Sequence, residues 1–297
     1  MSEDRRNWIG GSDVASIFGV SPWKTALELF EEKTAPEFIP PEVTPEREKL
    51  YRRGKKLEPW VLEMLQEEHP ITVIGRNLRF QDKLNPWMSC EEDFECIVEG
   101  ETCNGEIKTV SPFAAGEWGE QGSDEIPIAY CLQVLYGLML TGRKNAVVAA
   151  LIGADDLRLY HVTFDEELAA EIRKRVVQFW TGHVIPKVPP PVQTIADVNR
   201  VLARHGGFVL QGEESIWNAI RDLRMVKADV KAADERKKEL ELQIKKYFVM
   251  QAEALGMTDA PKKFSILGPD GKQMCSVAMQ HRSAYSVEAT DFLVMRT

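Results

Sequence analysis

The residues best able to do chemistry lie in one short segment, GEIKTV, at residues 105–110. Alternate side chains of an extended strand share a face, so we expect Glu106 and Lys108 to point together and Ile107 to face the opposite layer. If a hairpin sets Asp93 beside Glu106, the two carboxylates form an oxygen-rich site suited to Mg²⁺ or Mn²⁺. Lys108 would orient a metal-bound water or stabilise charge on a phosphate. The pattern therefore favours phosphodiester hydrolysis.

An isolated Glu-x-Lys is also what a surface hairpin with an ordinary salt bridge contains, and exposed pairs of this kind are common and weak. Two further polar residues occur where a buried apolar face is expected. Glu58 borders the apolar stripe of a predicted helix, where it either needs a cation or reaches solvent. Gln133 lies within the apolar run IAYCLQVLYGLML, so its amide needs a bound water, a metal ligand or a backbone carbonyl as a partner.

The elements that must position these residues follow from the apolar periodicity. We predict a short helix from Ser12 that stops at Gly19, a second helix from about Lys24, and an amphipathic helix over 45–68 with Leu50, Leu57, Val61 and Leu65 on one face. Strands follow over 71–81 and within 92–110, then a buried helix over 128–140, strands at 145–153 and 156–164, and a helix to residue 184. This order predicts an α/β domain with a mixed central sheet flanked by helices.

The prolines of IPKVPPPV, residues 185–192, mark a domain edge because clustered prolines cannot continue a helix. We therefore predict a domain over 1–192 and a C-terminal extension over 193–297. The extension begins with heptad-spaced positions, from Ile216 to Tyr247, that are apolar at nine of ten places, so we expect a long helix with a coiled-coil-like seam. Its partner is either another chain or the main domain. A terminal hairpin is expected to turn at residues 269–271.

Composition sets outer limits. No stretch approaches the roughly 18 apolar residues of a membrane span, and the N-terminal segment lacks the apolar run of a secretory signal, so we expect a cytoplasmic protein without membrane contact. The five cysteines contain no CxxC pair, which gives no support for a zinc site or an iron–sulfur cluster and favours small buried side chains. The net charge of −9 leaves room for local basic patches and does not decide the partner.

Four segments, in this order, resemble the lambda-exonuclease-like family of phage recombination nucleases, the YqaJ-type viral recombinases of the PD-(D/E)xK nuclease superfamily. They are IGGSDVASIFGVSPWKTALELFEEKT, RRGKKLEPWVLEML, the region from Asp93 to Lys108, and YCLQVLYGLMLTGRKN. The resemblance covers roughly residues 5 to 180, and the combination is more specific than any one segment. It implies the PD-(D/E)xK restriction-endonuclease-like core and a metal-dependent deoxyribonuclease.

The resemblance also implies roles for individual residues. It makes Asp93 and Glu106 metal ligands, with the backbone carbonyl of Ile107 completing the shell, and Lys108 the catalytic lysine. Glu58 becomes an auxiliary acid and Gln133 the active-site glutamine.

In the opening segment, Ser12 and either Arg6 or Arg5 resemble the residues that hold a DNA phosphate, and a serine that begins a helix is also a natural N-cap. The family usually has Pro-Asp-Gly at its first aspartate, where this chain has Glu92-Asp93-Phe94. Glu91, Glu92 and Glu95 are therefore alternatives to Asp93.

Three functions follow as hypotheses. The leading one is a Mg²⁺-dependent exonuclease, with Mn²⁺ as a possible substitute, that acts 5′ to 3′ on duplex DNA ends and leaves single strands for an annealing protein in phage-type recombination. The resemblance further implies a homo-oligomer of phage or prophage origin in a bacterial host cell. The second hypothesis is an endonuclease of the same fold, since fold alone does not set the substrate. The third is a non-catalytic DNA-binding or assembly protein.

Overall fold

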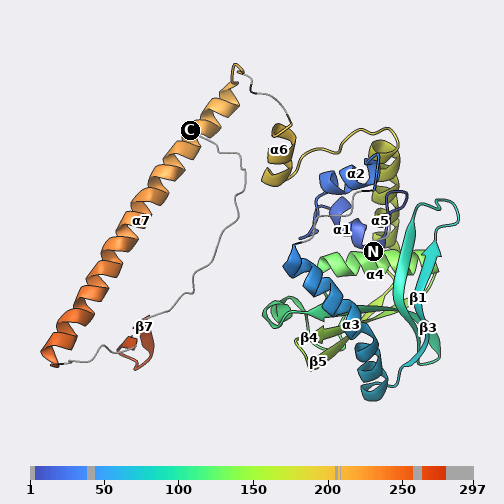
Figure 1. Ribbon diagram of the computed structural model, residues 1–297, viewed down its shortest axis with the longest axis horizontal. Coiled ribbons are helices and arrows are strands. Elements are labelled where there is room, and N and C mark those ends of the chain that lie inside the picture. Colours follow the sequence, from blue (N-terminus) through green and yellow to red (C-terminus); the bar gives the residue numbers. More distant parts are fainter. Residues whose placement is uncertain (1–3, 39–43, 205–206, 208, 257–262, 279–297) are drawn as a thin grey trace. The chain divides into compact units, whose positions relative to one another are not determined.

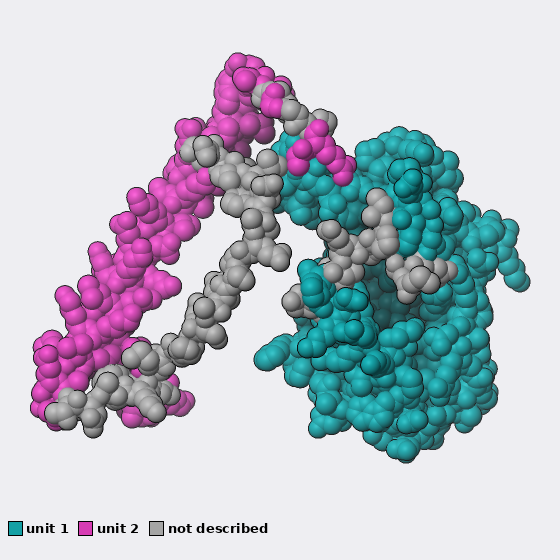
Figure 2. All heavy atoms as spheres, viewed as in Figure 1, with its two compact units in different colours: residues 1–202 teal, residues 203–297 magenta. Residues whose placement is uncertain are grey.

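The structure is a computed structural model, and it describes residues 4–38, 44–204, 207, 209–256 and 263–278 of the chain. It divides into two compact units, residues 1–202 and 203–297 (Figure 2). The predicted edge after residue 192 stays a prediction, while the short helix α6 (Ile195–Leu202) belongs to the first unit. Asp197 at its start accepts a hydrogen bond of 2.6 Å from the Thr25 hydroxyl, which ties α6 to that unit.

A five-stranded mixed sheet forms the centre of the first unit (Figure 1). The strands are β1 (Thr72–Gln81), β2 (Ser89–Val98), β3 (Glu101–Val110), β4 (Asn145–Ile152) and β5 (Asp156–Thr163). They lie side by side in sequence order. Every neighbouring pair is antiparallel except β3 and β4, which are parallel because the helix between them returns the chain to the same edge. The predicted mixed sheet is confirmed.

Helices cover both faces of this sheet (Figure 1). They are α1 (Gly11–Ile17), α2 (Ala26–Thr34), α3 (Pro45–Glu68), α4 (Ile128–Thr141) and α5 (Glu166–Phe179), with a 3₁₀ turn at Pro112–Glu117 and a π turn at Trp180–Val184. Gly19 follows α1 with a φ of 72°, the left-handed conformation that glycine adopts freely and that ends the helix. Thr25 caps α2 by accepting a hydrogen bond from the Glu28 N–H at 3.2 Å.

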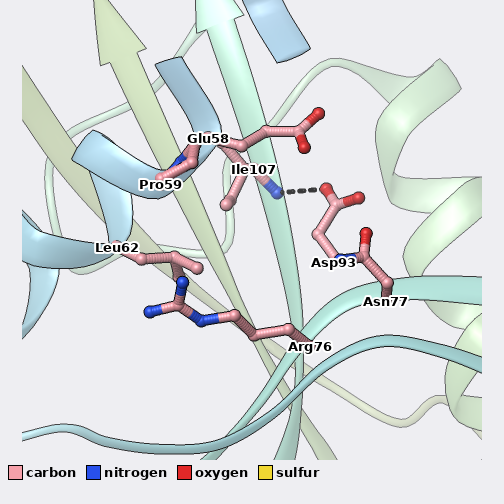
Figure 3. A pocket seen from close by; sticks show the side chains of 7 residues that line it. All are labelled: Glu58, Pro59, Leu62, Arg76, Asn77, Asp93 and Ile107. Carbon is pink, nitrogen blue, oxygen red and sulfur yellow. Dashed lines mark hydrogen bonds between the residues drawn. The ribbon is translucent and has the colours of Figure 1, made fainter. Parts of the chain in front are cut away.

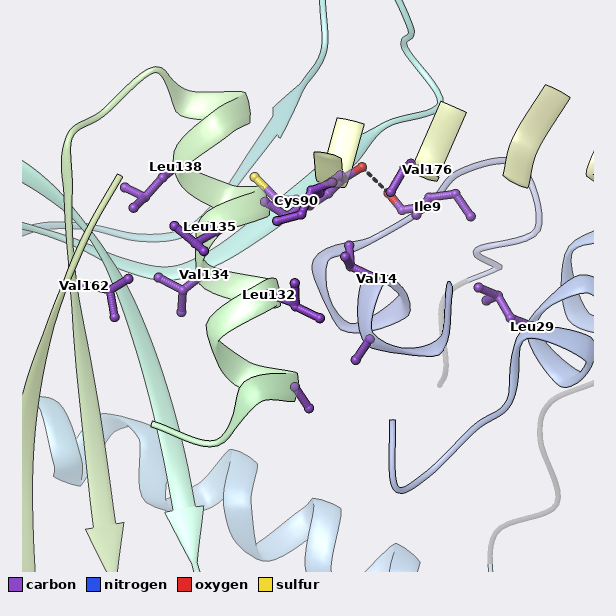
Figure 4. Close-up of a cluster of buried hydrophobic side chains, with 14 of the residues drawn as sticks. Ile9, Val14, Leu29, Cys90, Leu132, Val134, Leu135, Leu138, Val162 and Val176 are labelled. Atoms are coloured by element: carbon purple, nitrogen blue, oxygen red, sulfur yellow. Dashed lines mark hydrogen bonds between the residues drawn. The ribbon is translucent and has the colours of Figure 1, made fainter. Parts of the chain in front are cut away.

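Two apolar layers result, one on each face of the sheet. The larger packs α1, α2, α4 and α5 against the sheet, and Figure 4 shows its centre, where the Tyr136 hydroxyl also donates to the Ile9 carbonyl at 2.9 Å. The smaller layer packs α3 against the other face. Strand β4 serves both because its side chains alternate, with Val148 in the larger layer and Val147 in the smaller. Apolar side chains thus pack on both faces of the sheet, which holds the polar residues of β2 and β3 in place.

The apolar stripe predicted on α3 is correct at one end and wrong at the other. Val61 and Leu65 are fully buried, whereas Leu50 is 53% exposed. The N-terminal part of α3 extends beyond the smaller apolar layer, whose members from this helix begin at Leu57. Periodicity gave the face of the helix correctly, but the point where the sheet stops covering it depends on the tertiary structure.

The second unit contains the long helix α7 (Glu214–Ala254) and a two-stranded hairpin of β6 (Lys263–Leu267) and β7 (Gln273–Ala278). Both the long heptad-patterned helix and the hairpin are confirmed, and Gly271 in the turn has a φ of 76°. Seam positions such as Val226, Val230 and Leu240 are exposed within the described residues. Residues 279–297 of the predicted extension lie outside the described part of the chain.

The five cysteines are free thiols, and Cys90, Cys96 and Cys103 are buried as small apolar side chains, as expected. Among the described residues, no helix is both long and apolar enough to cross a membrane.

Candidate active site

The candidate site forms where strands β2 and β3 separate. Their main-chain pairing runs from Val98 and Glu101 to Phe94 and Gly105 and goes no further. At the next position the Asp93 carboxylate accepts the Ile107 N–H at 2.8 Å. The side chain thus satisfies a strand N–H that the partner strand leaves unpaired, and it fixes the Asp93 carboxylate beside β3.

Glu106 and Lys108 point to the same side of β3, as predicted, and Gln133 of α4 joins them. Lys108 Nζ donates to Glu106 Oε1 at 2.5 Å and to Gln133 Oε1 at 3.1 Å. The Gln133 amide nitrogen donates to the same Glu106 oxygen at 2.7 Å. The partner of Gln133 is therefore neither a backbone carbonyl nor a water, because its two ends bridge the carboxylate and the ammonium and hold both in one orientation.

Burial excludes the reading of GEIKTV as a surface hairpin. Glu106 is only 6% exposed, and Ile107 lies in the apolar layer under α3, on the opposite face. Lys108 Nζ also lies 4.7 Å from the centre of the Tyr130 ring, a cation–π distance. A charged pair held in this way costs desolvation energy that an exposed pair does not, so stability alone gives no reason for it.

Burial and mutual repulsion shift the pKa values of the acidic side chains at the site. Burial raises the pKa of Glu106 to about 7, with the Asp93 charge adding to the effect and the Lys108 charge opposing it. Burial likewise raises the pKa of Asp93, although the Ile107 N–H lowers it in part. Burial and then the Asp93 charge raise the pKa of Glu58. For Lys108, burial opposes the charged form, but the neighbouring groups, Glu106 first and then Asp93, together raise its pKa.

A small cavity of about 70 Å³ opens next to these acids, on the α3 side of the sheet. Figure 3 shows that Glu58 of α3 and Asp93 of β2 both reach toward it, with Ile107 between them and Asn77 of β1 beside Asp93. Asn77 has a left-handed φ of 51°. Glu58 is half-buried and lies 3.8 Å from the Lys55 ammonium. It is thus a border residue whose carboxylate shares a cavity with Asp93.

A divalent cation suits this donor set. The buried Glu106 carboxylate, the partly buried Asp93 carboxylate that repels it, and Glu58 at the cavity offer only oxygen ligands, as does the adjacent strand backbone. Oxygen is the ligand type that Mg²⁺ and Mn²⁺ prefer. Within the described residues, no three side chains of His, Cys, Asp or Glu lie close enough together to hold a metal alone. The site would therefore need backbone or water oxygens besides its carboxylates.

Comparison with known proteins identifies the segment that contains these residues. A family model, the YqaJ-like viral recombinase domain, matches residues 2–144. Residues 2–144 are thus similar to the YqaJ-like viral recombinase domain. All of the predicted site residues, from Arg5 to Gln133, lie within the matched segment.

Individual relatives of this chain are distant. The uncharacterised protein YqaJ of Bacillus subtilis strain 168 is 27% identical over 252 residues, or 82% of this chain and 75% of YqaJ. Among solved structures, the alkaline exonuclease LHK-Exo from Laribacter hongkongensis has a TM-score of 0.47 and 15% identity, covering 67% of this chain and 95% of its own. A phage-related exonuclease from Haemophilus somnus 129PT has a TM-score of 0.41 and 14% identity, covering 59% and 92%.

The acids considered as alternatives to Asp93 have other surroundings in the structure. Glu91 is exposed and lies 3.9 Å from Arg79, and Glu95 forms an ion pair with Arg143. Glu92 is buried against α4, and its Oε1 would be 2.2 Å from a Cβ added at Gly137. Burial raises the pKa of Glu92 to about 8, with Glu106 contributing. Of the four acids, Asp93 is the one that lines the cavity with Glu58.

Near the N-terminus, the prediction that Ser12 caps the first helix is wrong. Gly10 is the N-cap, and Ser12 lies in the first turn. The carboxylate that completes the cap is Asp13, which accepts the Gly10 N–H at 3.0 Å. Ser12 stays exposed, and its hydroxyl lies 3.4 Å from the Arg5 guanidinium.

The structure separates the two candidate arginines. Arg6 is occupied by Asp4, at 2.7 Å, and by the Ala35 carbonyl, at 3.2 Å. Arg5 lies against Ser12 and over the Trp8 ring, and its buried Nε has no hydrogen-bond partner. The structure thus places Arg5 next to Ser12, whereas Arg6 binds Asp4 and Ala35 instead.

Sequence reasoning missed the buried ion cluster that holds this corner in place. Asp13 is 3% exposed and lies 3.1 Å from Lys33 Nζ and 3.4 Å from the Arg5 guanidinium. Burial opposes ionisation of Asp13, yet the Lys33 and Arg5 charges hold its pKa at about 2. Lys33 also donates to the Arg5 carbonyl at 2.8 Å. A lysine at an apolar position of the second helix was the only signal in the sequence, and nothing local identifies its partner.

Proposed function

We propose that this protein is a metal-dependent deoxyribonuclease, an exonuclease that degrades one strand of duplex DNA from its end. The observation that carries the proposal is the buried arrangement of Glu106, Lys108 and Gln133, with Asp93 held beside the same strand and lining a small cavity. A hydrolase needs such a set of charged groups at one place, whereas the packing of the fold does not require them. The YqaJ-like viral recombinase domain supports DNA as the substrate.

In this proposal Asp93, Glu106 and the Ile107 carbonyl hold one divalent ion, with Mg²⁺ as the expected ion and Mn²⁺ as a substitute. When bound, the ion supplies an activated water and neutralises negative charge on the phosphate. Lys108 provides a fixed positive charge for the phosphoryl oxygens as their charge increases. Gln133 keeps the Lys108 and Glu106 side chains in one orientation, and Glu58 contributes a further acceptor at the cavity.

The polarity and the biological role belong to the same proposal. Arg5 and Ser12 form a polar corner suited to a phosphate oxygen, because the guanidinium and the hydroxyl both donate. A 5′-terminal phosphate bound there would orient the strand for 5′ to 3′ degradation. The single strand left behind would then serve a strand-annealing protein. A homo-oligomer around the duplex would keep the enzyme on its substrate, and sedimentation at micromolar concentration tests that assembly.

The test uses linear and covalently closed circular duplex DNA, each with Mg²⁺ and with a chelator, and separate labels on the two 5′ and two 3′ ends. We expect the wild type to degrade only linear DNA, only with metal, and to release the 5′ labels first. The Glu106→Gln variant should be inactive, while Glu101→Gln, an exposed residue of the same strand, should keep activity.

Other outcomes point elsewhere. Nicking of the closed circles would assign the site to an endonuclease, because an exonuclease needs an end. An absence of cleavage with every metal would refute the hydrolase and leave a DNA-binding or assembly role. Release of the 3′ labels first would keep the hydrolase and reverse the polarity.

A further inference from the structure

Four aromatic rings run in contact from the core of the first unit to its surface beside the candidate site. Tyr160 is fully buried, and its hydroxyl donates to the Gly119 carbonyl at 3.0 Å. Its ring centre lies 5.2 Å from that of Trp118, which lies 5.6 Å from Tyr130. Tyr130 lies 5.5 Å from Trp23. These spacings are those of favourable aromatic pairs, so each ring supports the next.

The third ring of this ladder, Tyr130, adjoins Lys108. The Tyr130 ring that contacts Trp23 is the same ring that lies 4.7 Å from Lys108 Nζ. Two ring contacts therefore connect the exposed indole with the ammonium group of the candidate site. The outer indole of the ladder thus belongs to the surroundings of the candidate site.

Trp23 is exposed although its backbone is held in place. The Ser21 hydroxyl accepts the N–H groups of Trp23 at 3.2 Å and of Lys24 at 3.3 Å. Lys24 Nζ also lies 3.8 Å from the buried Asp13 carboxylate. Even so, the Trp23 side chain is 51% exposed, whereas Trp118 in the same ladder is 6% exposed. A fixed, half-exposed indole leaves apolar area in water that its own fold does not bury.

We infer that Trp23 is a stacking platform for an unpaired base of the DNA strand whose backbone lies at Lys108. The inference rests on the proposed function, because that function brings a phosphodiester to Lys108. An indole face binds any base, and such stacking contributes about 1–3 kcal/mol per base. Neighbouring stacked bases are about 3.4 Å apart along a strand. An indole two ring contacts from Lys108 is therefore within reach of nucleotides next to the scissile bond.

The experiment measures stacking without cleavage. Duplexes with 2-aminopurine at the terminal or the penultimate position of the strand to be degraded are bound to protein that carries Glu106→Gln. The fluorescence of the base reports stacking, and a titration gives Kd. Trp23→Ala, Trp23→Phe and Trp217→Ala are compared in this background. Trp217, on α7, is 53% exposed and controls for the loss of any exposed indole.

We expect Trp23→Ala to abolish the quenching of 2-aminopurine and to raise Kd by about 5- to 160-fold, which is the stacking energy converted to affinity. Trp23→Phe should retain most of both signals, which excludes misfolding as the cause, and Trp217→Ala should match the parent.

A wild type that cleaves DNA while Trp23→Ala leaves quenching and Kd unchanged overturns the stacking role alone. A quench that depends on Trp23, in a protein that never cleaves, supports stacking and refutes the hydrolase. A protein that binds no DNA overturns both.

Discussion

Binding of a divalent ion should stabilise the first unit, and the stabilisation should fall as the pH is lowered through 7. The pKa of Glu106 is raised by burial from 4.5 to about 7. In the ligand-free fold this group holds its proton more tightly than in the unfolded chain, so its contribution to stability is present at low pH and lost as the pH rises toward 7. A cation binds the ionised form and therefore reverses that loss only at the higher pH.

The magnitude follows from the fraction of Glu106 that is ionised. With a pKa of about 7, the carboxylate is about nine-tenths ionised at pH 8 and about one-tenth ionised at pH 6. Apparent metal affinity therefore falls about tenfold, or about 1.4 kcal/mol. At a Mg²⁺ concentration of 100 times the Kd at pH 8, stabilisation is about 2.7 kcal/mol, and it falls to about 1.4 kcal/mol at pH 6.

Thermal unfolding followed by tryptophan fluorescence is the suitable assay, because six of the seven tryptophans lie in the first unit. For a unit of this size the expected increase in Tm with Mg²⁺ is roughly 5–10 °C at pH 8 and roughly 3–5 °C at pH 6. Glu106→Gln should lose most of the shift at both pH values, and Glu101→Gln should keep it. Equal shifts at pH 6 and pH 8, or an undiminished shift in Glu106→Gln, would refute this account of the site.

Three further outcomes are expected. Lys108→Ala should lower cleavage by about 100- to 1,000-fold, the order found when one key stabilising donor is removed, with circular dichroism unchanged. A variant as active as the wild type would remove this lysine from the mechanism. Gly137→Ala should destabilise the first unit by about 1–3 kcal/mol in urea titrations, because the new Cβ would lie 2.2 Å from a buried carboxylate oxygen. The control Gly182→Ala, where a Cβ meets open space, should be close to neutral. Arg5→Ala should weaken binding to 5′-phosphorylated ends and leave 5′-hydroxyl ends unaffected, while Arg6→Ala changes neither; equal effects of the two variants would contradict the assignment of Arg5.

The alternation of β3 and the apolar run of α4 are properties of local sequence, and both were predictable. Period-two alternation places Glu106 and Lys108 on one side of any strand at this position. A single polar residue in the apolar run of α4 has to find a partner, whichever fold the chain adopts. The same reasoning gave the order of helices and strands, the heptad helix α7 and the terminal hairpin. Periodicity and turn chemistry act over a few residues, so one sequence contains them in full.

The remaining features depend on which distant segments meet, and only the tertiary structure decided them. The parallel pairing of β3 with β4 brings α4 over β3, which is why Gln133 reaches Glu106. The separation of β2 from β3 frees the Ile107 N–H for Asp93 and rules out a plain hairpin.

At the N-terminus, Ser12 is a good capping residue by type, but the fold gave the cap to Gly10 and Asp13 and fixed Asp13 with a lysine from α2. Side-chain pairs between elements far apart in the chain have no local signal. The sequence by itself therefore determined the candidate residues and their faces, and the packing of the sheet determined their partners.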